Sequence, residues 1–155
     1  VLFRSYYEKP VRPDNTEWRD EEISKRHREW GWNCPAVDID FLVCEYNLGK
    51  PVALVEYKRH RMKVINESDI NYRVLRDLAD ARLRPLPFFV CFYWPEIWAF
   101  KVVPMNETAR SYLVQDTIMC EFDYVSFLYK LRRIALKNEL SDKLNREMPK
   151  DVLTA

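Results

Sequence analysis

Glycine is nearly absent from this sequence, with two residues in 155. Phosphate-binding loops and dinucleotide-binding folds need several closely spaced glycines, so the sequence excludes both classes of nucleotide site. Long apolar runs are also missing, because none approaches the ~20 residues that a membrane helix requires. No signal peptide is visible. We therefore expect a cytoplasmic protein with no membrane segment.

Cysteine spacing and net charge give no direct indication of a ligand. The four cysteines form no CxxC pair and no other zinc-binding spacing. Cys44 and Cys91 fall inside expected strands, so we expect buried free thiols, which suit a reducing cytoplasm. Basic and acidic residues balance at 25 against 24. Any field that attracts nucleic acid must therefore come from a local cluster of basic residues.

Apolar and aromatic residues, by contrast, are abundant, at 48% and 14% of the chain. This composition argues against disorder, and the length suffices for one domain with its own core. We expect a single domain over residues 1–135. Residues 136–155 are charged and sparsely apolar, which predicts a tail or a frayed helix.

A β-hairpin is the clearest local prediction. The apolar runs Phe41–Cys44 and Val52–Val55 flank an Asn-Leu-Gly-Lys-Pro segment at 47–51. Val, Leu and Phe on both sides of an Asn/Gly turn are the strongest short-range indication of two antiparallel strands. The polar residues at the tip, including Glu45, are expected to face solvent.

Acidic side chains stand at the open end of this hairpin. Side chains alternate between the two faces of a strand, so Asp38 and Asp40 share one face of the first strand. By the same rule Glu56 and Lys58 share a face of the second. A turn centred on Leu48 places Asp40 opposite Glu56, whereas a turn centred one residue earlier places Asp38 there. Opposed carboxylates repel each other, so either register favours a hard divalent cation with oxygen ligands.

Asp40 followed by Glu56-Tyr57-Lys58 on the next strand resembles the motif of the PD-(D/E)xK nuclease superfamily, which includes restriction endonucleases and Holliday-junction resolvases. The resemblance covers the order of elements over about the first hundred residues, and the motif itself is three residues. No proline immediately precedes either aspartate, the nearest being Pro35. Whether Asp38 or Asp40 fills the family's position therefore stays open.

The resemblance implies a metal-dependent endonuclease that hydrolyses phosphodiester bonds, with DNA as the expected substrate and Mg²⁺ (or Mn²⁺) as the cofactor. In the family the Asp and Glu bind the metal ion, and the Lys orients or activates the attacking water. The implied catalytic residues are Asp40, Glu56, Lys58, Asp38 and Glu22. The implied metal ligands are Asp40, Glu56 and Asp38. Glu22 is included because a first-helix Glu often reaches the metal in this family; a solvated surface acid is the alternative.

Basic residues follow the motif directly. Residues 58–63 contain four Lys or Arg and no acid, which suits phosphates beside a metal site, although a solvated loop explains them equally well. In the resembled fold a side chain of the next helix can approach the scissile phosphate; Tyr72, Arg73 and Arg76 could do so here, although surface salt links explain them equally well. The candidate nucleic-acid contacts are Arg59, Arg61, Lys63, Arg73 and Arg76.

The remaining elements complete an α/β pattern. Expected helices cover about 16–30, 68–83 and the region after 120, and expected strands cover 87–93 and 97–103, with a short irregular or helical stretch from 106. In the helix at 68–83, Ser68 is the expected cap. Its expected buried stripe is Ile70, Val74, Leu75, Leu78 and Ala79. The order resembles the restriction-endonuclease-like αβββαβ core, a mixed sheet flanked by helices, with an early strand short or hidden in 5–11.

Several interpretations stay open at this point. Trp94 and Trp98 could be stacking platforms for bases, although packing against the sheet explains them as well. A non-catalytic nucleic-acid-binding or protein-binding module with the same fold is the main alternative to a nuclease. Ordinary surface charges on the hairpin are a third interpretation. Homodimers are common in the resembled family, but no interface is visible in the sequence.

Overall fold

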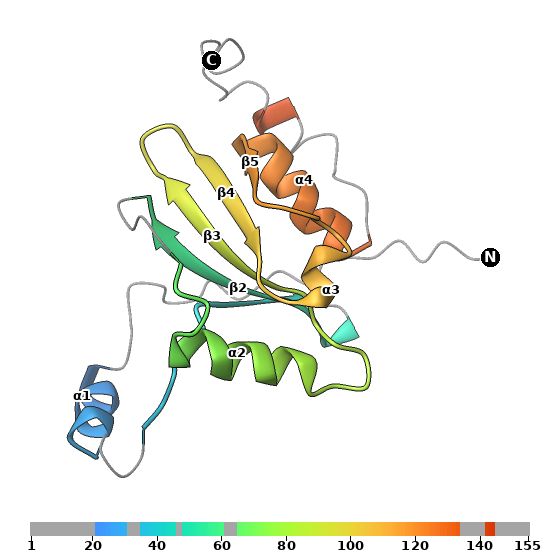
Figure 1. Ribbon diagram of the computed structural model, residues 1–155. Helices are drawn as coiled ribbons and strands as arrows, with labels where there is room; N and C mark the ends of the chain where they lie inside the picture. The colour runs from blue at the N-terminus through green and yellow to red at the C-terminus, as the bar shows by residue number, and fades with distance from the viewer. Residues whose placement is uncertain (1–20, 31–34, 46–47, 61–64, 134–141, 145–155) are drawn as a thin grey trace.

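The computed structural model describes residues 21–30, 35–45, 48–60, 65–133 and 142–144. Over these ranges the chain is an α/β structure with one five-stranded sheet in the order β1-β2-β3-β4-β5 (Figure 1). The strands are β1 (Phe41–Glu45), β2 (Lys50–Arg59), β3 (Phe88–Trp94), β4 (Ala99–Pro104) and β5 (Thr117–Met119). The helices are α1 (Glu21–Trp30), α2 (Ile70–Asp80), α3 (Glu107–Arg110) and α4 (Glu121–Leu131).

The sheet is mixed, as expected. β2 and β3 run parallel, and the other three neighbouring pairs are antiparallel. Parallel neighbours need a crossover connection, and α2 provides it between β2 and β3. Helices α2 and α4 cover opposite faces of the sheet (Figure 1). The general α/β class with helices on both sides is therefore confirmed.

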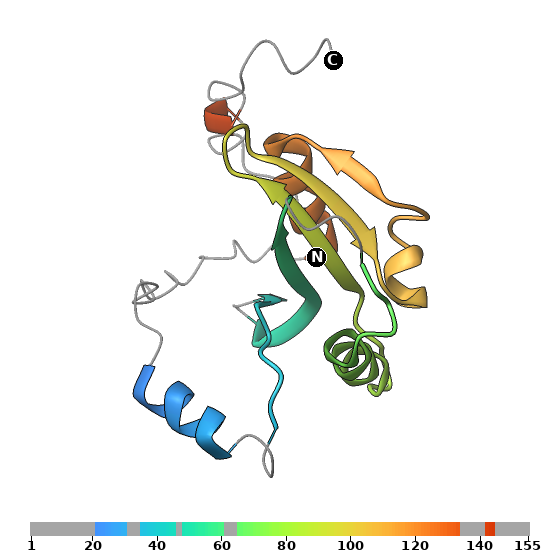
Figure 2. The same cartoon turned by 60° about the vertical axis from the view of Figure 1, so that its left-hand side comes forward.

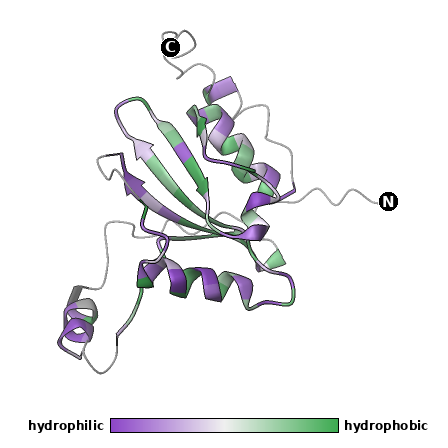
Figure 3. Cartoon of the chain, in the orientation of Figure 1, coloured by the Kyte–Doolittle hydropathy of each residue, from purple (hydrophilic) through white to green (hydrophobic). Residues whose placement is uncertain are grey.

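Two apolar clusters fill the space on either side of the sheet. On one face, Leu54, Phe88 and Val90 pack against Leu75 of α2. On the other, residues of the same strands, such as Phe89, pack against α4. Because β3 is covered on both faces, its sequence is a continuous apolar run rather than an alternating one. Figure 3 shows this hydrophobic centre, and β2 becoming hydrophilic toward its arrowhead.

The hairpin forms with the register that a turn centred on Leu48 predicts. Phe41 pairs with Val55 and Val43 with Ala53, and a bulge then shifts the register before the tip. Gly49 takes a φ of 61°, in the left-handed region that side-chain-bearing residues rarely adopt. One of the two glycines is therefore placed where the turn requires it.

Helix α2 differs from its expected boundaries and buried face. Its cap is Asp69 rather than Ser68, since the Asp69 carboxylate accepts a hydrogen bond of 2.8 Å from the backbone N–H of Asn71. The buried residues are Tyr72, Leu75 and Ala79. The predicted burial of three of the five stripe residues is wrong, because the helix turns the amphipathic Tyr72 toward the sheet. The exposed three are Ile70, Val74 and Leu78.

Glu45 also departs from expectation. It is 8% exposed rather than solvent-facing, and Arg132, which ends α4, donates hydrogen bonds of 3.1 and 3.3 Å to its Oε2. The two residues lie 87 positions apart in sequence. The pair joins the tip of the hairpin to the far end of α4.

Asn106 connects α2, β3 and α3 through a buried side chain. Its Oδ1 accepts from the N–H groups of Phe88 and Ala109, which places it as the cap of α3. Its Nδ2 donates to the carbonyl of Leu86 and to the carboxylate of Asp80. The short helical stretch expected from this residue is therefore confirmed.

Several expectations concern residues outside the described ranges, including the early strand at 5–11, Cys34 and most of 136–155. Within those ranges, Cys91 is a buried free thiol as expected, and Cys44 is half-buried and free. In the described part of the chain, no helix is long and apolar enough to cross a membrane.

Candidate functional site

The open end of the hairpin brings Asp40 and Glu56 together. Extending the observed pairing of Phe41 with Val55 by one step places these two acids opposite each other. The backbone N–H of Asp40 donates a 3.2 Å hydrogen bond to Glu56 Oε1, and the N–H of Tyr57 donates a 3.0 Å bond to Asp40 Oδ2. The register therefore selects Asp40, rather than Asp38, as the partner of Glu56.

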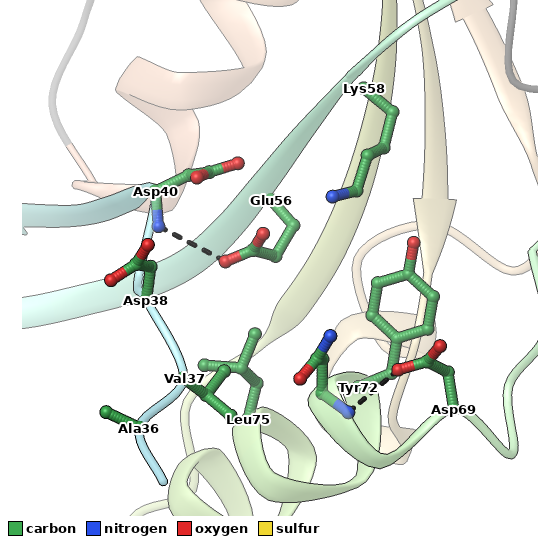
Figure 4. A pocket seen from close by; sticks show the side chains of 10 residues that line it. Ala36, Val37, Asp38, Asp40, Glu56, Lys58, Asp69, Tyr72 and Leu75 are labelled. Atoms are coloured by element: carbon green, nitrogen blue, oxygen red, sulfur yellow. Dashed lines mark hydrogen bonds between the residues drawn. The ribbon is translucent and has the colours of Figure 1, made fainter. Parts of the chain in front are cut away.

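A hollow of about 420 Å³ opens beside this pair, between the strand ends and the start of α2 (Figure 4). Lys58 extends into it from the same face of β2 as Glu56, two residues further along. Asp38 enters from the segment that leads into β1. The full lining is Ala36, Val37, Asp38, Asp40, Glu56, Lys58, Asp69, Asn71, Tyr72 and Leu75.

Glu56 is the electrostatically costly member of the group, since only 7% of it is exposed. Burial raises its pKa above the ordinary 4.5, and the nearby charge of Asp40 raises it further. The N–H of Asp40 and the ammonium of Lys58 act in the opposite direction. The net upward shift means that the ionised carboxylate is held at a cost, which a bound cation would remove.

Tyr72 contributes a phenol to the same hollow. It is buried on α2, and its pKa is raised by burial first and then by the negative charges of Asp69, Glu56 and Asp40. Its hydroxyl is therefore a neutral hydrogen-bond donor near neutral pH. Asp69 and Asn71 were not singled out from the sequence; the Asp69 N-cap position is the only local signal that could have found them.

The structure does not bring every predicted residue to this hollow. Glu22 is exposed on α1, which lies apart from the sheet in both views (Figures 1 and 2). Arg59 lies on the opposite face of β2, where its Nε donates to the Tyr93 hydroxyl. Arg76 donates instead to the carbonyls of Met105 and Glu67, which gives it a structural contact.

The other predicted nucleic-acid contacts are distributed differently. Arg73 is exposed on α2 and lines a separate shallow surface with Arg76. Arg61 and Lys63 lie outside the described residues. Of the predicted catalytic set, four therefore meet in one hollow, and the described basic candidates lie elsewhere.

Asp40 and Glu56 provide the kind of oxygen ligands that a divalent metal ion requires. Each carboxylate uses one oxygen to accept a backbone N–H, Oδ2 in Asp40 and Oε1 in Glu56. The two carboxyl groups also share a side-chain hydrogen bond, and loss of its proton would make an oxygen of each available to a ligand. Mg²⁺ is usually held by one or two carboxylates together with waters and substrate phosphate, so two such oxygens fit it. Among the described residues, no group of three or more His, Cys, Asp or Glu side chains is arranged to hold a metal ion.

Comparison of the chain with protein-family models, with curated proteins and with solved structures found no match.

Proposed function

We propose that this protein is a Mg²⁺-dependent nuclease of the PD-(D/E)xK type, which hydrolyses phosphodiester bonds of DNA. The observation that carries the proposal is the meeting of Asp40, Glu56 and Lys58 in one hollow at the open end of the hairpin. These are the three residues that resemble the family motif. The order of hairpin, α2, β3 and β4, with helices on both faces, supports a restriction-endonuclease-like core.

Each residue has a role that follows from its position. Asp40 and Glu56 would hold one Mg²⁺, which when bound would neutralise phosphate charge and lower the pKa of a coordinated water. Asp38, on the rim, would orient a second water or complete the ligand set.

Lys58 and Tyr72 supply hydrogen-bond donors to the same hollow. The Lys58 ammonium, two residues beyond Glu56, would orient the attacking water or hold a non-bridging phosphate oxygen. The Tyr72 phenol, which is neutral near pH 7 and whose pKa burial raises further, would donate to a phosphate oxygen without adding charge. Both donors would stabilise the charge that develops on the phosphate as the P–O bond breaks.

Incubation of the protein with plasmid, linear, single-stranded DNA and RNA, with and without Mg²⁺ or Mn²⁺, tests the proposal. We expect metal-dependent cleavage of DNA by the unaltered protein. Glu56→Ala, Asp40→Asn and Lys58→Met should each reduce the rate by at least about 10²-fold, the usual contribution of a positioned catalytic group. Circular dichroism should show an unchanged fold.

The matched control is Glu96→Gln, which removes an exposed carboxylate from the turn between β3 and β4. This variant should cleave at the unaltered rate. Undiminished cleavage by all three site variants would contradict the mechanism. Binding of Mn²⁺ and DNA without any cleavage would instead favour the non-catalytic binding module.

A further inference from the structure

A second hollow lies on the opposite face of the sheet from the acidic one. Its volume is about 400 Å³. Six aromatic rings line it, from four different strands, the turn before β4 and α4: Phe41, Tyr57, Tyr93, Trp98, Phe100 and Tyr124. Nothing in the proposed hydrolysis requires these rings, and Phe41 and Trp98 are exposed although an ordinary core would enclose them too.

The rings are arranged to receive a flat ligand. Trp98 and Phe100 stack with centroids 6.4 Å apart and an angle of 22° between their planes, and Phe100 stacks on Tyr124 at 4.2 Å and 14°. Phe41 stands edge-on to Tyr57 at 5.1 Å. Trp98 is nevertheless 49% exposed and Phe41 60%. Phe100 and Tyr124 are buried, so the stack ends at Trp98, the one ring of the three that is open to solvent.

Trp98 adopts a backbone conformation that is unfavourable for its bulky side chain. Its φ is 47°, in the left-handed region that suits Gly or Asn and is costly for a bulky aromatic residue. Such strain is concentrated at functional sites, because the preferred turn residue would lack the side chain that the site uses. If position 98 served the turn alone, a small residue such as Gly or Asn would suit its backbone conformation better than Trp.

The rim of the hollow carries polar groups of both signs. Arg59 is exposed on this face, and its Nε donates a 3.4 Å hydrogen bond to the hydroxyl of Tyr93. Glu121, at the start of α4, lies on the rim as well. A guanidinium beside stacked rings suits a ligand that has a planar ring and an adjoining anion. A carboxylate on the rim can accept a hydrogen bond from the exocyclic amine of a base.

The floor of the hollow is uncharged. The hydroxyls of Tyr57 and Tyr124 share a hydrogen bond there. Burial raises the pKa of Tyr57 to about 12 and raises the pKa of Tyr124 as well. Tyrosine hydroxyls are uncharged at neutral pH even without such a shift, so the floor presents neutral aromatic surface to a ligand.

The two hollows are joined through consecutive residues of the hairpin. Phe41 follows Asp40, and Tyr57 lies between Glu56 and Lys58. Neighbouring side chains of a strand point to opposite faces, so one face of this strand end carries the acids and the other carries the rings. A strand of nucleic acid that reached the acidic hollow would be close to the rings.

We propose that this aromatic hollow binds one unpaired base of a single-stranded nucleic acid, stacked on the exposed ring of Trp98, with Arg59 against a neighbouring phosphate. The inference goes beyond the proposed function, since the base would be bound whether or not the strand is cleaved. Rings on which bases stack are the usual means of holding single strands without reading their sequence.

Fluorescence anisotropy with a labelled single-stranded DNA of mixed sequence tests this binding, in EDTA so that no cleavage occurs. Trp98→Ala should weaken binding about 5- to 100-fold, the loss expected when one stacking partner is removed. Trp98→Phe, which retains a ring, should restore most of the affinity. The matched control is Trp30→Ala on α1, where a tryptophan of similar exposure (47%) is removed.

An abasic strand of the same length separates stacking from phosphate attraction. The unaltered protein should bind it about 5- to 100-fold more weakly than the base-bearing strand, and Trp98→Ala should bind both about equally. Arg59→Gln should weaken both strands and reduce the dependence of affinity on salt.

Equal affinities of Trp98→Ala and the unaltered protein for the base-bearing strand would overturn the inference. Unaltered affinity for the strand combined with loss of a dimer, measured by sedimentation, would assign the hollow to a second copy of this chain instead. The outcome is independent of the nuclease assay. Trp98-dependent binding without cleavage would contradict only the proposed function, and cleavage with Trp98-independent binding would contradict only this inference.

Discussion

Two buried glutamates in this structure have opposite surroundings. Glu45 is 8% exposed and forms an ion pair with Arg132. Glu56 is 7% exposed, and among the described residues no cation lies within ion-pair distance of it. A buried carboxylate without such a partner is costly, and proteins keep one mainly where its charge is used. At the residue scale, Glu56 is therefore the strongest indication of a functional site.

The raised pKa of Glu56 gives stability a definite dependence on pH. Because its pKa in the folded state lies above the unfolded value of 4.5, its contribution to stability is fully present below that value. The contribution is lost as the pH rises through the folded pKa. The Glu56→Gln side chain cannot ionise, so this variant lacks the pH-dependent loss of stability. We expect the Tm of this variant, measured in EDTA, to fall less than that of the unaltered protein between about pH 4 and about pH 7.

Glu96→Gln serves as the control for this measurement, because Glu96 is exposed. Its Tm should follow the unaltered protein over the whole range. If Tm depends on pH in the same way for Glu56→Gln and for the unaltered protein, burial does not raise the pKa of Glu56.

At the scale of elements, the Glu45–Arg132 pair holds the last residue of β1 against the end of α4. Their side chains are 10% and 19% exposed, so Arg132→Ala removes a cation and two hydrogen bonds from a carboxylate that is largely shielded from solvent. We expect Arg132→Ala to lower the free energy of unfolding by about 3 kcal/mol, as for other buried pairs broken from one side. Urea denaturation followed by circular dichroism measures the change.

An exposed pair in the same protein provides the comparison. Arg110 and Glu107 of α3 are 3.0 Å apart, and the Glu107 side chain is 92% exposed. Arg110→Ala should therefore cost less than about 1 kcal/mol. Replacing Glu45 and Arg132 together with methionine should recover most of the stability, because neither buried charge is then present. Equal losses for Arg132→Ala and Arg110→Ala would contradict the burial argument.

The hairpin and α2 show which elements could be predicted from sequence. The hairpin register is a local property, fixed by a turn that needs Gly49 and by strands whose two faces differ. The sequence therefore predicted that an aspartate of the first strand would lie opposite Glu56 but left Asp38 and Asp40 as alternatives, and the observed register selects Asp40. The buried face of α2 depends on how the helix is rotated over the sheet. Tyr72 and Val74 are both compatible with the core from sequence, and only the contacts with the sheet select Tyr72.

Contacts between distant segments explain the remaining differences. The sequence around Glu45 contains no sign that Arg132, 87 residues away, would cover it. The same holds for the aromatic hollow, whose rings come from β1, β2, β3, β4 and the turn before β4, and α4. The sequence alone makes Trp98 a candidate stacking platform for bases. It does not indicate which five rings surround Trp98 in the folded chain.

For the molecule as a whole, a metal bound to the folded state alone must stabilise it. A ligand at about 100 times its Kd adds about 2.7 kcal/mol to the free energy of unfolding. For a protein of this size, that corresponds to a Tm increase on the order of 5–10 °C. We expect Mg²⁺ or Mn²⁺ to raise the Tm of the unaltered protein by such an amount, measured by differential scanning fluorimetry against EDTA.

Two variants test whether the metal ion that raises the Tm is bound by Asp40 and Glu56. Asp40→Asn should show no more than a residual increase, because one of the two ligands has lost its charge. Trp98→Ala should retain the full increase, because its ring lies on the other face of the sheet. A metal-induced increase that survives in Asp40→Asn would place the ion elsewhere in the chain.

The alternation of side chains along β2 has a consequence for how this protein can change. Glu56 and Lys58 face one side, and Tyr57 and Arg59 face the other. Inserting or deleting one residue upstream within the strand would exchange the two sets, placing carboxylate and ammonium among the rings and a phenol among the acids. Insertions or deletions in β2 are therefore tolerable only when they change its length by an even number of residues. Homologous or engineered chains that keep both hollows must obey this rule.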